Sequence, residues 1–189
     1  MNSNQAKTSR RRLLAAFAST AVLTAAPVYS KASGLLRHAG DVRRISMHNQ
    51  RTGETIDTIY WIEGEYIRPA LDEISYFMRD WRENKTIAYD RTNIDILAAA
   101  HSLMETSEPY LLLSGYRSPK TNAMLRSRSR GVASNSFHVK AKAADLRLKS
   151  RSVSQMAAAA LACGAGGVGK YYGSNFVHMD SGPVRTWRG

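Results

Sequence analysis

The order in which helical and strand-like patterns follow one another restricts the fold of this chain more than any other feature. Residues 67–84 carry apolar side chains three or four positions apart, which predicts an amphipathic helix, and residues 93–107 repeat this spacing. A third helix is predicted over 152–164, with Ser152 or Ser154 as its N-cap.

Short strand patterns fill much of the remaining sequence, most of them in its second half. Residues 43–61 predict a hairpin around a turn at 51–54. Further strands are predicted within 109–119, 143–148, 166–173 and 174–180, and a short basic helix or loop at 120–129. Helices mostly early and strands mostly late favour an α+β fold, with helices packed on a small, mainly antiparallel sheet.

The composition fits one globular domain that meets an anionic partner. The chain has 189 residues, of which 43% are hydrophobic, and we expect residues 31–189 to form a single domain. Its formal net charge is +12, and the first thirty residues account for four of these charges, leaving about +8. A basic surface of this size suits nucleic acid, lipid headgroups or a wall polymer with carboxylates.

The single cysteine limits the kinds of site that the chain can form. Cys163 has no partner for an internal disulfide, and a zinc cluster built on cysteines is excluded. We expect Cys163 to be buried as a small apolar residue. His101 lies on or beside the apolar stripe of the second helix and is predicted to be structural. A metal site would therefore use other histidines together with carboxylates.

The first thirty residues have the pattern of an export signal. A basic run is followed by a mild apolar segment and then by small residues, which is the secretory order. The Arg10-Arg11 pair also resembles the twin-arginine motif. Cleavage after Ser30 or Ala32 is predicted, with a retained membrane anchor at 13–30 as the alternative. The protein is expected in the periplasm of a Gram-negative cell.

Three residues with metal-binding side chains stand out in the second half of the chain. His138 and Asp145 lie seven positions apart, too far for one helical face, so a loop that returns as a strand suits them. His178 lies on a predicted strand, on the same face as Phe176 and Asp180. Catalytic zinc needs about three such ligands and an open position. Spacing alone leaves a metal site and ordinary hydrogen-bonded histidines both open.

The residues around the first two candidates resemble a family motif. Ser136 and His138, followed by Ala143 and Asp145, resemble the S-x-H-x-x-G-x-A-x-D motif of the zinc D,D-peptidases. That family shares its fold with the hedgehog signalling domain. The resemblance implies an α+β fold of that type and zinc held by His138, Asp145 and His178.

Two longer segments look like a narrower branch of this family. Residues 114–138 and 165–187 are similar to the YcbK-type murein endopeptidases, and the resemblance covers roughly residues 40–189. It implies a zinc metallopeptidase that hydrolyses the peptide cross-links of peptidoglycan, with zinc-activated water as the nucleophile. Stem-peptide bridges, including diaminopimelate–diaminopimelate links, are the implied substrate rather than a terminal residue.

An arginine in a second family motif is the candidate for stabilising charge during the reaction. Ser114-Gly115-Tyr116-Arg117 matches a motif in which the arginine touches the substrate. When an amide carbonyl is attacked its oxygen becomes negative, and a fixed guanidinium nearby stabilises it. The alternative is that Arg117 forms only a salt bridge after a strand.

The sequence departs from the family pattern at two positions. Ala141 replaces the glycine of the motif, which is tolerable only if the backbone there does not need a positive φ. Asn175 stands where many members carry a proton-accepting residue, three positions before the last zinc ligand. We expect Asp180 to substitute as the general base, or alternatively to hydrogen-bond a ligand imidazole and fix its tautomer.

The resulting prediction is an exported murein endopeptidase that binds peptidoglycan stem peptides and inserts into no membrane after signal cleavage. A basic run at Arg126, Arg128 and Arg130 could meet the stem carboxylates, or be only a solvated loop. A wall-binding module that keeps the fold without catalysis is the alternative, favoured by Ala141 and Asn175. A nucleic-acid partner is not expected, because an export signal argues against it.

Overall fold

The structure, a computed structural model, describes residues 41–129 and 131–189. The predicted export signal and its cleavage positions therefore lie outside the described residues, as does Arg130. Among the described residues, no helix is both long enough and apolar enough to cross a membrane.

The described residues form an α+β fold built on one open, mixed sheet of eight strands, in the order β3-β2-β1-β4-β5-β7-β6-β8. The strands are β1 (Val42–Asn49), β2 (Thr55–Ile62), β3 (Glu65–Tyr66), β4 (Tyr110–Ser114), β5 (Ala143–Arg147), β6 (Gly167–Tyr171), β7 (Phe176–Asp180) and β8 (Arg185–Arg188). The helices are α2 (Arg68–Phe77), α3 (Arg91–Leu103), α4 (Pro119–Arg128), α5 (Val153–Ala162) and the 3-10 turn η2 (Phe137–Lys140).

The sheet is mainly antiparallel, as the sequence predicted, with two exceptions. β1 runs parallel to β4, and β6 runs parallel to β8. The remaining neighbours pair antiparallel. The α+β prediction is therefore confirmed, whereas β3 and β8 were not predicted, because strands of two and four residues carry too little pattern to be recognised.

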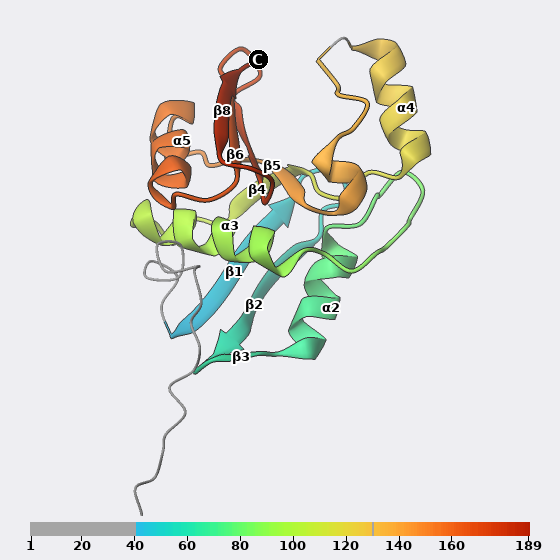
Figure 1. The fold of residues 1–189 in the computed structure, drawn as a ribbon. Coiled ribbons are helices and arrows are strands. Elements are labelled where there is room, and N and C mark those ends of the chain that lie inside the picture. The colour runs from blue at the N-terminus through green and yellow to red at the C-terminus, as the bar shows by residue number, and fades with distance from the viewer. Residues whose placement is uncertain (1–40, 130) are drawn as a thin grey trace, which may run out of the picture.

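The helices cover the sheet and bury its core. α2 packs on β2, α3 on β1 and β7, and α5 on β6 and β7, while α3 and α5 also contact each other. Figure 1 shows α3 crossing in front of the sheet and α4 standing apart from the other helices. Large side chains at the centre, such as Tyr60, Tyr110 and Met179, are fully buried.

The first predicted helix is shorter than its apolar spacing suggested. α2 ends at Phe77, whereas the spacing continued to Trp81. The reason is Asp80, whose backbone exchanges hydrogen bonds with Lys85 and whose carboxylate accepts the backbone N–H of Ser118 at 2.8 Å. These tertiary bonds hold residues after Met78 as a turn that packs against the start of α4.

The other predicted helices are present, and local chemistry explains where they start. Ser152, rather than Ser154, caps α5 in a capping box with Gln155. The basic segment at 120–129 is a helix, because Ser118 caps the backbone N–H of Thr121 and Pro119 occupies the first turn. α4 therefore begins two residues after Arg117, next to the predicted site.

Candidate metal centre

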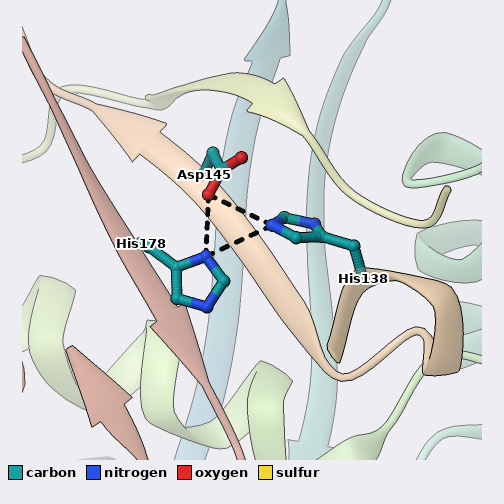
Figure 2. Close-up of side chains that lie close together, drawn as sticks. All are labelled: His138, Asp145 and His178. Carbon is teal, nitrogen blue, oxygen red and sulfur yellow. Dashed lines mark hydrogen bonds and ion pairs between the residues drawn. The ribbon is translucent and has the colours of Figure 1, made fainter. Parts of the chain in front are cut away.

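The three predicted ligands come from two paired strands and a short turn. Asp145 on β5 lies directly opposite His178 on β7 in the antiparallel register. His138 reaches the same place from η2, beside the start of β5 (Figure 2). All three side chains are almost completely buried, with residue exposures of 2%, 6% and 8% for His138, Asp145 and His178. The fold thus brings together residues that lie up to forty positions apart.

The backbone around His138 is fixed by a small number of hydrogen bonds. The hydroxyl of Ser136 accepts the backbone N–H of His138, which starts the turn. The ring Nδ1 of His138 lies 2.7 Å from the carbonyl oxygen of Gly115, so it donates its proton there and leaves Nε2 with a lone pair. Gly115 is required at this place, because a Cβ would lie 2.5 Å from the carbonyl oxygen of Met78.

The spacing of the donor atoms fits a single metal ion. Nε2 of His138 lies 3.2 Å from Oδ1 of Asp145 and 3.2 Å from Nδ1 of His178, and the last two atoms are 2.8 Å apart. Ligands about 2.0–2.2 Å from zinc at tetrahedral angles are about 3.4 Å from one another. An expansion of a few tenths of an ångström would therefore fit the two nitrogens and one oxygen to zinc. The described residues contain no other cluster of this kind.

The electrostatics favour two of the residues in the protonation states that metal ligands need. Burial lowers the pKa of His138, with a further contribution from the neighbouring Arg117, so its imidazole is neutral. Burial alone would raise the pKa of Asp145, but contacts with His138, His178 and Arg117 hold it well below its ordinary value. A neutral imidazole and an ionised carboxylate are the forms that bind a metal.

The third predicted ligand, His178, is held by a second carboxylate. Nε2 of His178 lies 3.0 Å from Oδ2 of Asp180, so the nitrogen facing Asp145 is Nδ1. Burial lowers the pKa of His178, but hydrogen bonds to Asp145 and Asp180 outweigh it and leave the pKa raised. Asp180 is fully buried, and its other contacts are to the backbone N–H groups of Gly167 and Gly182 and to the side chain of Arg185.

Arg117 lies beside the cluster and touches it directly. Its guanidinium forms an ion pair with Oδ2 of Asp145, and its Nε donates to the hydroxyl of Ser114 at 2.7 Å. The side chain also lines the cleft above the cluster. The salt bridge considered for Arg117 therefore exists, and the side chain that forms it is also part of the cleft lining.

A cleft of about 590 Å³ opens over the three residues. His138, Asp145 and His178 line it together with residues of the segment after α4, including Ser129 and Asn135. Strands β6, β7 and β8 add aromatic side chains to the lining, Tyr171, Phe176 and Trp187. Tyr171 and Phe176 stack with ring centroids 4.3 Å apart.

Comparison with known proteins identifies the family of this chain. A family described as peptidoglycan L,D-endopeptidase MepK matches residues 37–187. The chain is 43% identical over 145 residues to the peptidoglycan L,D-endopeptidase MepK of Escherichia coli K12, covering 77% of this chain and 80% of that protein. A probable peptidoglycan L,D-endopeptidase MepK of Haemophilus influenzae is 36% identical over 157 residues, covering 78% and 80%.

The chain belongs to the MepK family. This confirms the resemblance to murein endopeptidases, which rested on residues 114–138 and 165–187.

One expectation about the departures from the motif is wrong. Ala141 has φ 49°, in the left-handed region, although the sequence argument tolerated alanine only where φ is not positive. Its backbone closes η2 by donating to the carbonyl oxygen of His138, and its methyl group is fully buried. Burial of the methyl group compensates part of the backbone strain, so this MepK-family chain keeps an alanine there.

Asn175 occupies a turn and is not part of the lining of the cleft. It also has a positive φ, 51°, at the end of the tight connection between β6 and β7. Asparagine is one of the few residues that adopt this conformation readily. Asn175 lines a separate pocket with Gln50 and Arg147, so its side chain faces away from the three clustered residues.

The other residues singled out in the sequence lie away from the three clustered side chains. Nε2 of His101 lies 2.8 Å from the carbonyl oxygen of Glu108, and its ring packs edge-on against Tyr110, which agrees with a structural role. Cys163 is buried, as expected. Arg126 and Arg128 are exposed on the last turn of α4, beyond which the segment lining the cleft begins.

Sequence reasoning missed the residues that β8 contributes to the site. Arg185 and Trp187 both line the cleft, and the Trp187 ring centroid lies 5.3 Å from that of His178. Gly169 on the neighbouring strand makes room for this ring, because a Cβ there would lie 2.6 Å from it. The alternation of Arg185 and Trp187 was the available signal, but four residues were too few to identify a strand.

Proposed function

We propose that this protein is a secreted, zinc-dependent peptidoglycan L,D-endopeptidase that hydrolyses peptide cross-links between stem peptides. The observation that carries the proposal is the convergence of His138, Asp145 and His178 on one point in the lining of a cleft. Membership of the MepK family supports the activity, because two relatives bear the name of this activity. The diaminopimelate–diaminopimelate link is the proposed bond.

The metal proposal rests on donor chemistry as well as on distance. Nε2 of His138, Nδ1 of His178 and Oδ1 of Asp145 would hold the zinc, since their other polar atoms are engaged elsewhere. When bound, zinc would supply a Lewis acid that activates water for attack on an amide. Because the three residues line a cleft, water could reach a fourth position on the metal, as a catalytic rather than a structural zinc site requires.

Arg117 is proposed to act on the substrate carbonyl. Its guanidinium lines the cleft next to Asp145 and carries a permanent positive charge. Negative charge that develops on the carbonyl oxygen would be stabilised there, and the hydrogen bond to Ser114 restricts the guanidinium in advance of the reaction. The same ion pair orients Asp145 toward the metal position.

Asp180 is proposed to fix the tautomer of His178 rather than to accept a proton from water. A general base needs an oxygen that can reach the reacting water, whereas Asp180 is fully buried and does not line the cleft. Its carboxylate accepts the Nε2 proton of His178 in a hydrogen bond, which leaves Nδ1 free for the metal. Of the two roles that the sequence left open, the geometry supports this one.

Export by the twin-arginine route to the periplasm is proposed from the sequence of the first thirty residues. Peptidoglycan lies outside the cytoplasm, so an enzyme that acts on it must be exported. Changing Arg10 and Arg11 to lysine is expected to leave the protein in the cytoplasm, as detected by cell fractionation. Normal delivery of this double variant to the periplasm would exclude the route.

The decisive experiment is digestion of purified muropeptides. The protein, loaded with zinc, is expected to split dimers joined by diaminopimelate–diaminopimelate links and to spare dimers joined by a D-alanine–diaminopimelate link. A chelator should stop the cleavage and added zinc should restore it. Binding of both muropeptides without cleavage would support the non-catalytic wall-binding alternative instead.

A further inference from the structure

Arg185 contacts the buried carboxylate behind His178 with both arms of its guanidinium. Nη1 lies 3.0 Å from Oδ1 of Asp180, and Nη2 lies 2.6 Å from Oδ2. The same Oδ2 accepts the Nε2 proton of His178. A chain of contacts therefore runs from Arg185 through Asp180 to the imidazole whose other nitrogen faces Asp145.

The guanidinium is itself held in place by its surroundings. It lies over the ring of Phe137, 5.1 Å from the centroid, and over the ring of Trp187, at 4.9 Å. Nη1 also donates to the carbonyl oxygen of Pro183 at 3.0 Å. Two aromatic faces and a carbonyl oxygen therefore restrict the planar group to the orientation in which its fork meets Asp180.

The neighbouring glycines show how closely this arrangement is packed. A Cβ on Gly167 would lie 2.3 Å from Nη1 of Arg185 and 2.7 Å from Oδ2 of Asp180. A Cβ on Gly182 would lie 2.4 Å from the ring of Phe137. The backbone approaches the ion pair on two sides where side chains would displace it, so the geometry leaves Asp180 little freedom to rotate away from His178.

Each of the two carboxylates in this region forms an ion pair with an arginine. Arg117 pairs with Asp145, and Arg185 pairs with Asp180. Without Arg185, the fully buried Asp180 would lose both bonds from the guanidinium and keep only those from the backbone N–H groups of Gly167 and Gly182 and from Nε2 of His178. Oδ2 would then be held by His178 alone, so the carboxylate would direct the imidazole less firmly.

We propose that Arg185 is a positioning residue of the metal centre, which clamps Asp180 against His178 so that Nδ1 is directed at the metal. The assignment rests on the proposed zinc site. It predicts that Arg185 acts on metal affinity and on the His178 imidazole, and that it takes no part in the reaction once zinc is bound.

The test is zinc affinity, measured by competition with a chelator of known affinity, for the full mature chain and the variant Arg185→Met. Loss of a residue that supports a ligand histidine typically weakens metal binding about 10–100-fold, and we expect about tenfold here because Arg185 acts through Asp180. At saturating zinc, the variant should regain nearly the wild-type turnover number. A turnover number that stays low in fully loaded protein would overturn a purely positioning role.

A second readout reports on the histidine itself. In zinc-loaded wild-type protein, the Nε2 proton of His178 should be detected by nitrogen-15 NMR as a slowly exchanging signal, because Asp180 accepts it in a buried hydrogen bond. In Arg185→Met, this proton should exchange faster. An unchanged signal together with a zinc affinity within twofold of wild type would overturn the proposal.

Two further variants control for folding and for charge. Arg188→Met, on the same strand, removes an arginine that lies over the Tyr172 ring and contacts no carboxylate in the described part of the chain, so its zinc affinity should be unchanged. Arg185→Lys keeps the charge without the fork and should weaken zinc at least threefold. A wild-type zinc affinity in Arg185→Lys would overturn the clamp. This test remains decisive if Arg185→Met fails to fold.

Zinc binding by the wild-type protein distinguishes failure of the metal centre from failure of the clamp. Wild-type protein that binds no zinc would overturn the proposed metal centre and the clamp together. Wild-type protein that binds zinc and cleaves muropeptides, beside an equally tight Arg185→Met, would overturn the clamp alone.

Discussion

Asp145 joins Arg117 to His178, because one carboxylate oxygen pairs with the guanidinium while the other lies 2.8 Å from Nδ1 of the imidazole. The residue proposed to meet the substrate and the residues proposed to bind zinc are thus linked through a single side chain. Substitutions on either side of Asp145 should therefore separate effects on rate from effects on metal binding.

Arg117→Ala is expected to reduce turnover about 100–1000-fold, the usual loss for one donor that stabilises a developing negative charge. Zinc affinity should stay within about tenfold, since Arg117 supports Asp145 without being a ligand. Muropeptide cleavage rates and metal content check the two parts. Arg68→Ala, an exposed change on α2, is the matched control and should leave both unchanged. Loss of zinc comparable to that of a ligand variant would contradict the assignment.

His138→Ala should abolish both tight zinc binding and muropeptide cleavage, because it removes one of three converging donors. Metal analysis of the purified variant is the direct measurement, with circular dichroism to establish that it is folded. His48→Ala, a change on β1 outside the cluster, serves as control and should bind zinc normally. A folded His138→Ala protein that keeps stoichiometric tight zinc would rule out the proposed ligand set.

Asp180→Asn should weaken zinc binding about 10–100-fold, with activity recovering as zinc is added, because its carboxylate supports a ligand imidazole. The measurement is cleavage rate as a function of free zinc concentration. Retention of wild-type affinity with a lower rate at every zinc concentration would instead identify Asp180 as the general base that the sequence first suggested.

Asp80 should make the stability of the protein depend on pH in acid. It is almost completely buried, and burial raises its pKa, but hydrogen bonds from Thr121, Ser118 and Arg82 outweigh burial and leave the pKa lowered. A carboxyl whose folded-state pKa is depressed stabilises the protein above its unfolded pKa of about 3.9, and this contribution disappears as pH falls through the folded value.

The measurement for Asp80 is urea unfolding at several pH values. Asp80→Ala should cost about 1–3 kcal/mol at neutral pH, because it leaves the buried N–H of Ser118 without its acceptor. The difference between wild type and variant should shrink as pH falls below about 4. A difference that stays constant down to pH 2 would show that ionisation of Asp80 does not contribute.

Ala141→Gly should change the free energy of unfolding by less than about 1 kcal/mol. Relief of left-handed strain is worth about 1–2 kcal/mol. Against this, the variant loses about 0.8 kcal/mol of methyl burial and gains about 0.4–1 kcal/mol of unfolded-state entropy cost. Chemical unfolding measures the balance, and a gain of more than 2 kcal/mol would mean that the alanine is a larger burden than its packing suggests.

The convergence of the three candidate ligands could be predicted from the sequence better than the residues that support them. His138, Asp145 and His178 stood within motifs whose residue types and order were distinctive, and the fold brings them together. The clamp was not predicted, since Arg185 lies on a four-residue strand whose parallel pairing with β6 depends on tertiary contacts. Such pairing leaves almost no local periodicity to recognise.

The left-handed backbone at Ala141 shows a different limit of sequence reasoning. Ala141 caps η2 in this conformation, where its own N–H donates to the carbonyl oxygen of His138 and the N–H of Lys142 donates to that of Phe137. A bond from a distant part of the fold adds to these local ones. The backbone N–H of Asp90, which caps α3, donates to the carbonyl oxygen of Ala141 at 3.0 Å. Only the assembled structure fixes that geometry, and alanine carries no signal of it.

The direct pairing of Asp145 with His178 across β5 and β7 has a consequence for how the sheet assembles. A slip of one residue between these strands would turn His178 to the opposite face, so only the native alignment can offer all three ligands. An ion bound solely to that alignment would favour it by about 2.7 kcal/mol at a free concentration one hundred times its dissociation constant. Zinc at the proposed site would therefore stabilise chains in which β5 and β7 pair in the native register. Chains with a misaligned register would gain no such stabilisation and would separate these strands more readily.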